Sequence, residues 1–195
     1  MSFNVLLSGV GGQGVVSAAD AIAEAAIRDE LRVRCADDTG VAQRGGGVNS
    51  HVKIGYSVAS PVIYPGTADV GLGFEPVEGV RWAHMLKPGG LMILNSRRVL
   101  PVTVKAGLQS FPDVTELSGL LGRLGLRTEW IDASGLAERA GSPLTLNSVM
   151  LGLLSGVLGF PIETDTLREV IMEKVPKKVV GMNFKAFEAA CAIHP

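Results

Sequence analysis

A short run near the N-terminus has the residue types and the spacing of a phosphate-binding turn. The sequence GVGGQG at residues 9–14 fits the pattern G-x-G-x-x-G and separates a predicted buried strand, residues 4–8, from a predicted helix, residues 15–27. Glycine permits a tight turn and lets a phosphate approach the main chain, and the N–H groups at the start of the helix favour an anion. We therefore expect phosphate or nucleotide contact at Gly9, Gly11, Gly12, Gln13 and Gly14. The other interpretation is a tight turn, or an interface made close by small residues.

A second glycine-rich segment, TGVAQRGGG at residues 39–47, lies between two further predicted strands, residues 31–35 and 48–54. Successive glycines expose consecutive N–H groups as an anion-binding concavity, and an arginine adds a fork of donors suited to phosphate. The candidates for anion contact in this loop are Gln43, Arg44, Gly45 and Gly46. Both loops follow the carboxyl ends of strands, which form the usual ligand edge of a parallel sheet. Alternatively, Arg44 pairs with a nearby aspartate and only orders the loop.

Asp37 and Asp38 support a different function. A dinucleotide-binding fold places an acidic residue about 20 positions after its glycine motif, where the carboxylate holds a ribose hydroxyl. These two aspartates stand in roughly that place, and they leave open a free-standing NAD(P)- or flavin-dependent oxidoreductase. Against this, an ordinary dinucleotide fold starts a crossover helix where this sequence has its second glycine loop.

No residue of this chain is predicted to be catalytic. The sequence has neither the Gly-x-Lys-[Ser/Thr] of a nucleotide-hydrolysing loop nor the Gly-x-Ser-x-Gly of a nucleophile elbow. Glu75 follows a predicted strand and is either an acid–base group or the cap of the helix that begins at Pro76. Arg97 and Arg98 follow another strand end and either help to bind an anion or belong to a solvated turn.

Side chains that bind metals are few and scattered. The two cysteines, Cys35 and Cys191, form no Cys-x-x-Cys pair, and an iron–sulfur cluster takes about four thiolates. This chain alone is therefore not expected to hold a cluster. The histidines show no His-Glu-x-x-His spacing, so no other metal site is predicted. Unpaired thiols, together with the absence of a secretory signal, predict a cytoplasmic protein.

Short apolar runs alternate with helical patterns along the chain. This alternation predicts a Rossmann-like α/β fold with a largely parallel sheet flanked by helices and an α-helical C-terminal portion. Besides the elements above, strands are predicted at residues 70–74, 91–94 and 126–131, and helices at residues 76–86, 114–124 and 144–158. For the last two helices, we expect Thr166 and Glu169 to form a capping box and Asn183 to act as a cap.

Composition limits the classes of protein that this sequence fits. The 195 residues are 47% hydrophobic and 19% charged, which predicts a single globular domain over residues 1–195. A net charge of −1 argues against a general nucleic-acid binder. The uncharged stretch at residues 140–162 has an apolar centre too short to span a membrane. A surface with few charges indicates that another subunit covers part of it.

The motifs together resemble those of a known family. The segments GVGGQGV (9–15), GVAQRGGGV (40–48) and SHVKIG (50–55) are similar to the two glycine loops and the following strand in the gamma domain of 2-oxoacid:ferredoxin oxidoreductases. The Ala-Gln-Arg-Gly-Gly form of the second loop resembles the indolepyruvate branch more than the pyruvate branch. The similarity extends over nearly the whole chain, through ADVGLGFEPVEGVR (68–81), LKPGGLMILN (86–95), NSVMLG (147–152) and NFKAFE (183–188).

The resemblance implies a role inside a complex. Enzymes of this family decarboxylate a 2-oxoacid oxidatively, join the acyl group to coenzyme A and pass the electrons to ferredoxin; the indolepyruvate branch favours arylpyruvates. Coenzyme A is then a co-substrate, and thiamine diphosphate and the iron–sulfur clusters are expected on the large (alpha) subunit. The chain is expected to be the small (beta) subunit, inactive alone, with its glycine loops facing coenzyme A or the large subunit. The possibility that the isolated chain forms a homodimer also stays open.

Overall fold

The computed structural model describes residues 2–39, 46–56, 59–100, 104, 107 and 110–193. It contains a six-stranded sheet with helices on both faces. The strand order is β2-β3-β1-β4-β5-β6. The strands are β1 (Ser2–Val10), β2 (Val33–Thr39), β3 (Gly47–Gly55), β4 (Ala68–Gly73), β5 (Leu86–Asn95) and β6 (Arg127–Ile131). The helices are α1 (Val15–Arg28), α2 (Pro76–Arg81), α4 (Val114–Arg123), α5 (Ala133–Ala140), α6 (Leu146–Ser155), α7 (Thr164–Lys174) and α8 (Val180–Cys191). Three short 3₁₀ turns are η1 (Ala83–Met85), η2 (Pro143–Thr145) and η3 (Lys177–Val179).

The sheet is largely parallel, as the sequence predicts. The pairs β1–β4, β4–β5 and β5–β6 are parallel, whereas β3 pairs antiparallel with both β1 and β2. The strand β3 therefore runs against all the others, and β2 points the same way as β1. Strands β2 and β3 are antiparallel neighbours, and only parallel neighbours need a crossover connection between them. This arrangement agrees with the reason given above against an ordinary dinucleotide fold.

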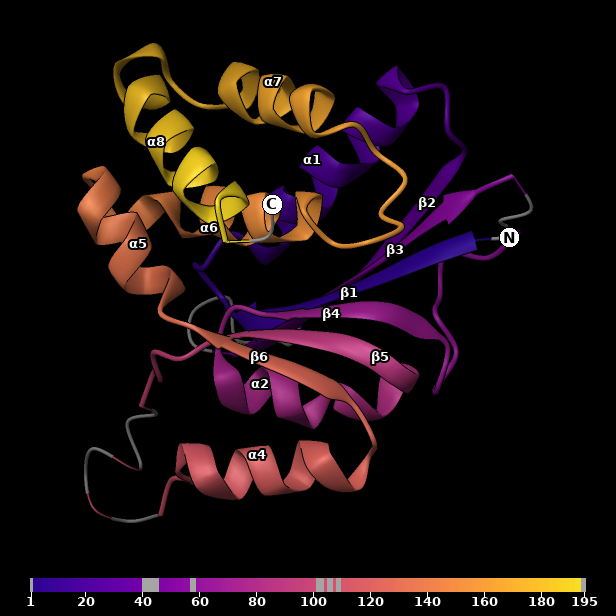
Figure 1. Ribbon diagram of the computed structural model, residues 1–195, viewed down its shortest axis with the longest axis vertical. Helices are drawn as coiled ribbons and strands as arrows, with labels where there is room; N and C mark the ends of the chain where they lie inside the picture. The colour runs from indigo at the N-terminus through magenta and orange to yellow at the C-terminus, as the bar shows by residue number, and fades with distance from the viewer. Residues whose placement is uncertain are drawn as a thin grey trace.

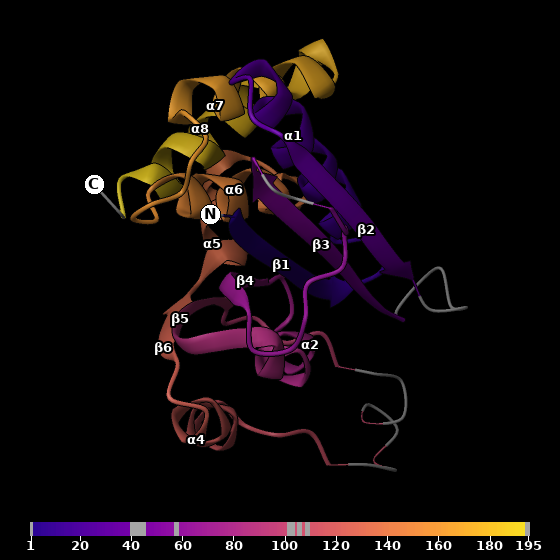
Figure 2. The same cartoon turned by 90° about the vertical axis from the view of Figure 1, so that its right-hand side faces the viewer.

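The helices form two layers. Figure 1 shows α1 and the C-terminal helices α5 to α8 over one face of the sheet and α2 and α4 over the other. The larger core cluster joins the sheet to α1, α6, α7 and α8, and a smaller one joins it to η1 and α4. Figure 2 shows the same layers from the side, with the edge strand β2 turned toward the viewer. The confirmed fold class is thus α/β with a helical C-terminal portion.

Small side chains let α1 lie close to the sheet. Its buried face is mostly alanine, including Ala18, Ala21 and Ala25, which are at most 3% exposed. The opposite face is charged, and Glu24 accepts from Arg28 at 2.7 Å and from Lys174 of α7 at 2.7 Å. The sequence predicts this division from the spacing of its charged residues.

The helix predicted at residues 76–86 is too long. Helix α2 ends at Arg81, a 3₁₀ turn follows, and β5 already begins at Leu86. Leu86 pairs with Ala68 of β4, so the chain has to be extended there rather than helical. The Lys-Pro-Gly-Gly segment at residues 87–90 lies in the first half of β5, where the pairing with β4 is irregular.

Both predicted caps in the C-terminal portion are wrong, and the short helix α5 was not predicted. Thr166 does not begin α7; its hydroxyl donates to the Asp29 carboxylate at 2.7 Å. Asn183 lies inside α8, where it is buried and its Oδ1 accepts from the Ser148 hydroxyl at 2.7 Å. In each case a partner distant in sequence replaces the local capping interaction. Within the described residues, no helix is long and apolar enough to cross a membrane.

Candidate functional site

The two glycine loops meet at the carboxyl edge of the sheet. The Gly11 amide donates to the Gly46 carbonyl at 2.9 Å, and Val10 at the end of β1 pairs with Gly47 at the start of β3. The expected juxtaposition of the loops is therefore present at their described ends. Gln43, Arg44 and Gly45 lie outside the described residues.

Glycine is required in the first loop for two different reasons. At Gly9, a Cβ would stand 2.9 Å from both Phe74 Cβ and Val15 Cγ2, so close packing excludes a side chain. Gly12 and Gly14 have φ values of +99° and +83°, in the left-handed region that strains other residues. A Cβ at Gly12 would meet nothing within 4 Å, so the main chain there is open to a ligand.

The start of α1 provides free amide donors at this loop. The first intrahelical bond runs from the Ala18 amide to the Gly14 carbonyl at 2.9 Å, and no side chain caps the helix at Gly14. The amides of Val15, Val16 and Ser17 precede that bond and have no partner within the helix. Together with the helix dipole, these donors favour an anion.

Gln13 has a structural role in this arrangement. Its Oε1 accepts from the Val10 amide at 2.8 Å, and its Nε2 donates to the Phe74 carbonyl at 3.1 Å. The side chain thereby ties the loop after β1 to the end of β4. Both polar atoms of the Gln13 amide group are engaged inside the protein.

A small hollow opens beside the first loop, with a volume of about 160 Å³. Its lining comes from two segments far apart in sequence: Gly12, Gln13, Gly14, Pro143, Leu144, Leu146 and Asn147. Asn147 Nδ2 lies 3.5 Å from the position of a Cβ at Gly14, while Asn147 Oδ1 accepts from the Ser148 amide at 2.9 Å. The amide nitrogen of Asn147 is thus a donor beside the loop. The volume suits a phosphate group rather than a whole nucleotide.

Sequence reasoning did not name Asn147 or Leu144 as site residues. Asn147 stands in a segment noted only for its resemblance to the family, and Leu144 was expected to lie in a buried helix. Leu144 is instead 85% exposed at the rim of the hollow, in η2. The only sequence signal was an asparagine one residue after the start of a helix, which is common in structural roles.

The acidic residues near this edge act in the fold. Glu75 is 2% exposed and caps α2 by accepting from the Glu78 amide at 2.9 Å, which confirms the capping interpretation. Burial raises the pKa of Glu75 and also that of Glu78, because their charged forms lose solvation. The Glu78 carboxylate lies close to Gly47, where a Cβ would be 2.7 Å from Glu78 Oε2.

The arginines after β5 are already engaged. Arg97 pairs with Glu138 and lies 3.9 Å from Asp132, and Arg98 donates to the Pro112 carbonyl at 3.2 Å. These contacts favour the turn interpretation over an anion site. The Asp37 carboxylate accepts from the Ser50 hydroxyl, so it too has a partner, on the neighbouring strand β3.

The described residues contain no group of three or more His, Cys, Asp or Glu side chains that could hold a metal ion. Cys35 lies exposed on β2 and Cys191 ends α8, and both are free thiols. His51 is buried, its Nδ1 accepts from the Ile63 amide at 3.2 Å, and burial lowers the pKa of its ring. This donor set does not fit an iron–sulfur cluster.

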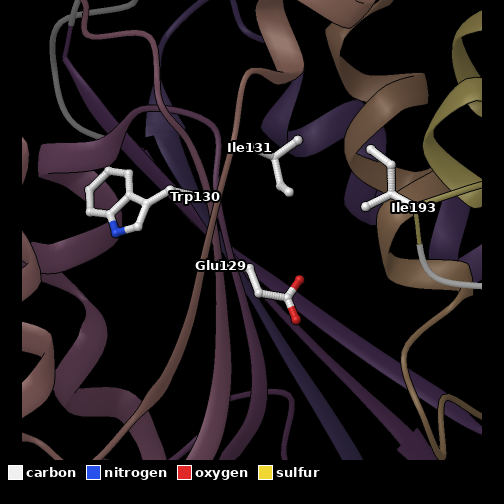
Figure 3. Close-up of a pocket in the computed structure, with 4 residues that line it drawn as sticks. All are labelled: Glu129, Trp130, Ile131 and Ile193. Atoms are coloured by element: carbon white, nitrogen blue, oxygen red, sulfur yellow. The ribbon is translucent and has the colours of Figure 1, made fainter.

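A larger hollow of about 530 Å³ lies at the other edge of the sheet, lined by Glu129, Trp130, Ile131 and Ile193. Figure 3 shows Glu129 and Ile131 on the side of β6 that faces Ile193, with Trp130 pointing away to the opposite side. A carboxylate among apolar side chains disfavours a phosphate. The small hollow at the glycine loops is therefore the better anion site.

The model of the family described as pyruvate ferredoxin/flavodoxin oxidoreductase matches residues 4–193. The chain belongs to this family. Indolepyruvate oxidoreductase subunit IorB of Archaeoglobus fulgidus is 40% identical over 188 residues, which cover 96% of this chain and 93% of that protein. Pyruvate synthase subunit PorC of Methanothermobacter marburgensis is 30% identical over 184 residues, covering 93% and 92%.

A solved structure is also similar. The chain matches 2-oxoglutarate:ferredoxin oxidoreductase from Magnetococcus marinus, with 2-oxoglutarate, coenzyme A and succinyl-CoA bound, at a TM-score of 0.76 and 25% identity. The match covers 99% of this chain and 31% of that longer chain. These findings confirm the resemblance read from the glycine loops and the expectation of an oxidoreductase subunit. They give no support to a free-standing NAD(P)- or flavin-dependent enzyme.

Proposed function

We propose that this chain is the small subunit of a 2-oxoacid:ferredoxin oxidoreductase whose substrates are arylpyruvates such as indolepyruvate. The observation that carries this proposal is the 40% identity to an indolepyruvate oxidoreductase subunit over nearly the full length of both chains. In the proposed reaction, a 2-oxoacid anion and the thiol of coenzyme A give an acyl-CoA, carbon dioxide and a proton, and two electrons pass to ferredoxin. Thiamine diphosphate and the iron–sulfur clusters belong to the large subunit in this proposal, since the donor set described here does not suit a cluster.

The contribution of this chain is to hold a phosphate group of coenzyme A at the glycine loops. Three features support this role: the amides at the start of α1, the open main chain at Gly12 and the donor of Asn147 beside Gly14. Gly11, Gly12, Gly14 and Gly46 supply main chain without side chains, and Gln13 fixes the shape of the loop. In this proposal Arg44 adds a positive charge, and Gln43 and Gly45 are further candidates for contact with the phosphate group.

The size of the hollow agrees with a site that is shared between this chain and the large subunit. A space of about 160 Å³ accepts a phosphate group but leaves the rest of coenzyme A outside. The remainder of the molecule then extends toward the large subunit, where the acyl group is formed. Leu144, exposed at the rim, lies where it contacts either the apolar arm of coenzyme A or the partner.

Reconstitution tests the proposed function. The chain is purified alone and with its large subunit, and each preparation is assayed with indolepyruvate, coenzyme A, thiamine diphosphate and a viologen acceptor. We expect turnover only from the complex, with arylpyruvates preferred over pyruvate and 2-oxoglutarate. Full turnover by the lone chain, or a preference for pyruvate, contradicts the proposal. We also propose that this chain is cytoplasmic, because Cys35 is an exposed free thiol and a reducing compartment keeps such thiols unpaired.

Arg44 offers a specific test of the coenzyme A role. Replacing Arg44→Ala in the complex is expected to raise the KM for coenzyme A about tenfold and to leave the KM for the 2-oxoacid unchanged, since a charge-assisted hydrogen bond contributes roughly 1.5 kcal/mol or more. Arg123→Ala, which removes an exposed arginine from α4, is the matched control. Equal KM values for coenzyme A in both variants would remove Arg44 from the site.

A further inference from the structure

The strand β2 ends the sheet with one side unpaired. Among the described residues, β2 pairs only with β3, in an unbroken register from Val33 opposite Ile54 to Thr39 opposite Val48. Most of its side chains are exposed. Figure 2 shows β2 as the outermost strand on this side of the sheet. A straight edge strand without proline or bulge is a template for another strand.

The hydrogen bonds of β3 fix which groups of β2 point outward. The Gly55 amide donates to the Arg32 carbonyl at 2.8 Å, so the main-chain groups of even-numbered residues in β2 face β3. On the other side of β3, the Gly46 carbonyl accepts from the Gly11 amide at 2.9 Å, which agrees with the same alternation. The N–H and C=O groups of Val33, Cys35, Asp37 and Thr39 therefore point to the open edge.

The charges of β2 are complementary to those of a second copy of the same strand. Two β2 strands that pair antiparallel over their whole length have a two-fold axis at the central residue, Ala36. In that register, Arg34 stands opposite Asp38 of the second copy, on the same face of the sheet, and the symmetry makes this contact twice. The outward groups then form the hydrogen-bonded pairs, while Arg34 and Asp38 occupy a non-hydrogen-bonded pair, where side chains approach most closely.

Other pairings lack this complementarity. A shift that places the axis at Asp37 puts two carboxylates opposite each other, and a shift to Cys35 leaves Arg34 opposite an alanine. At the other edge of the sheet, full-length antiparallel pairing of β6 places its central residue, Glu129, opposite its own copy. Like charges directly opposite each other destabilise a strand pair.

We propose that two copies of this chain associate through β2, joining their six-stranded sheets into one continuous sheet about an axis at Ala36. The contact leaves the glycine loops available, because the axis places Thr39 beside Val33 of the second copy rather than beside its Thr39. This association is independent of the proposed coenzyme A site.

Charge reversal tests the register by sedimentation of the full chain over a range of concentrations. Arg34→Asp and Asp38→Arg are each expected to weaken dimerisation about tenfold, since each places two like-charged pairs across the axis. The double variant Arg34→Asp with Asp38→Arg restores opposite charges and is expected to dimerise as the unchanged chain does. A monomeric unchanged chain, or a double variant as weak as the single ones, overturns the proposal. Arg34 lies opposite Lys53 of β3, so an aspartate there does not disturb the fold.

Cysteine pairing gives a second readout that does not depend on affinity. In a Cys35→Ser background, Ala36→Cys places two thiols on the axis, where the Cα atoms of a non-hydrogen-bonded pair are about 4.5 Å apart, within reach of a disulfide. Oxidation with diamide is expected to link the copies. Arg34→Cys and Asp38→Cys are expected to link only when the two variants are mixed. Linking of Arg34→Cys to itself contradicts the register.

The same Ala36→Cys variant is then assembled with the large subunit. A disulfide-linked pair of small subunits in the active complex supports the association. Loss of the link on assembly shows that the large subunit covers β2 and overturns the proposal for the complete enzyme.

Discussion

Gln13 and Phe74 join the two central strands of the sheet at its carboxyl edge. The Gln13 Nε2 atom donates to the Phe74 carbonyl at 3.1 Å, and Gln13 Oε1 accepts from the Val10 amide at 2.8 Å. The Phe74 carbonyl also accepts from Asn95 Nδ2 at 3.0 Å. One carbonyl at the end of β4 therefore anchors side chains that follow β1 and end β5, and the first glycine loop takes its shape from this point.

Replacing Gln13→Ala removes both hydrogen bonds and leaves the partly buried Val10 amide without its acceptor. We expect the free energy of unfolding to fall by about 1–3 kcal/mol, measured by urea denaturation. Gln13→Glu retains an acceptor for Val10 but places a carboxylate against the Phe74 carbonyl, so it should be no more stable than the alanine variant. An unchanged stability in both would show that the contact does not hold the loop.

Gly152 allows α6 and α8 to cross closely. A Cβ at this position would lie 2.5 Å from the Phe187 carbonyl oxygen and 2.8 Å from Ala190 Cβ. Gly152→Ala is expected to lower the free energy of unfolding by about 1–3 kcal/mol or more, because backbone cannot move aside easily. Thermal and urea denaturation measure this change.

Gly122→Ala is the matched control for Gly152. Gly122 lies in α4, and a Cβ there meets nothing within 4 Å. Alanine is a better helix former than glycine by up to about 1 kcal/mol, so this variant should be slightly more stable than the unchanged chain. Equal effects of the two substitutions would contradict the close crossing of α6 and α8.

The raised pKa of Glu75 makes the free energy of unfolding depend on pH. Burial raises its pKa above the ordinary value of 4.5, so the folded state binds its proton more tightly than the unfolded state. The stabilisation from this proton is complete below pH 4.5 and is lost as the pH rises through the folded pKa. Glu75→Gln keeps an oxygen acceptor for the Glu78 amide and cannot ionise. Its stability relative to the unchanged chain should therefore rise as the pH increases from 4.5.

Denaturant unfolding at several pH values between 4 and 8 checks this prediction. Glu75→Ala serves as the comparison: it cannot ionise either, so its stability should vary with pH as that of Glu75→Gln does, and it should lie about 1 kcal/mol below that variant at every pH because it loses the cap. A difference between Glu75→Gln and the unchanged chain that does not vary with pH contradicts the raised pKa.

The positions of β1, β3, β4 and α1 could be predicted because their signals are local, whereas β2 spans Val33–Thr39 instead of residues 31–35 and β5 begins at Leu86 instead of residue 91. Short apolar runs mark β1 and β4, a two-residue alternation bounded by glycines marks β3, and the alternation of alanine and charge marks α1. The end of α2 could not be predicted in this way, because it depends on the pairing of Leu86 with Ala68. The caps assigned to Thr166 and Asn183 failed for the same reason, since their partners, Asp29 and Ser148, lie far away in sequence.

In the candidate site, too, features with a local sequence signal could be predicted, and features set by distant contacts could not. Its glycines could be predicted from spacing, and the antiparallel position of β3 then brings the second loop against the first. Asn147 and Leu144 could not be predicted, because only the packing of η2 and α6 brings them to the first loop. The hydrogen bond from Gln13 to the Phe74 carbonyl could not be predicted either, because a glycine motif does not indicate where the glutamine side chain within it points.

The central claim is that the glycine loops bind a phosphate group of coenzyme A, and Asn147→Asp tests it most directly. The aspartate keeps an acceptor for the Ser148 amide and suits the start of a helix, so the fold should persist, but it replaces a donor with a negative charge beside Gly14. Lys177→Gln, at an exposed position, lowers the net charge equally and is the control. In the complex with the large subunit, we predict that Asn147→Asp raises the KM for coenzyme A at least tenfold while the control and the KM for the 2-oxoacid stay unchanged. An unchanged KM for coenzyme A in Asn147→Asp would contradict the claim.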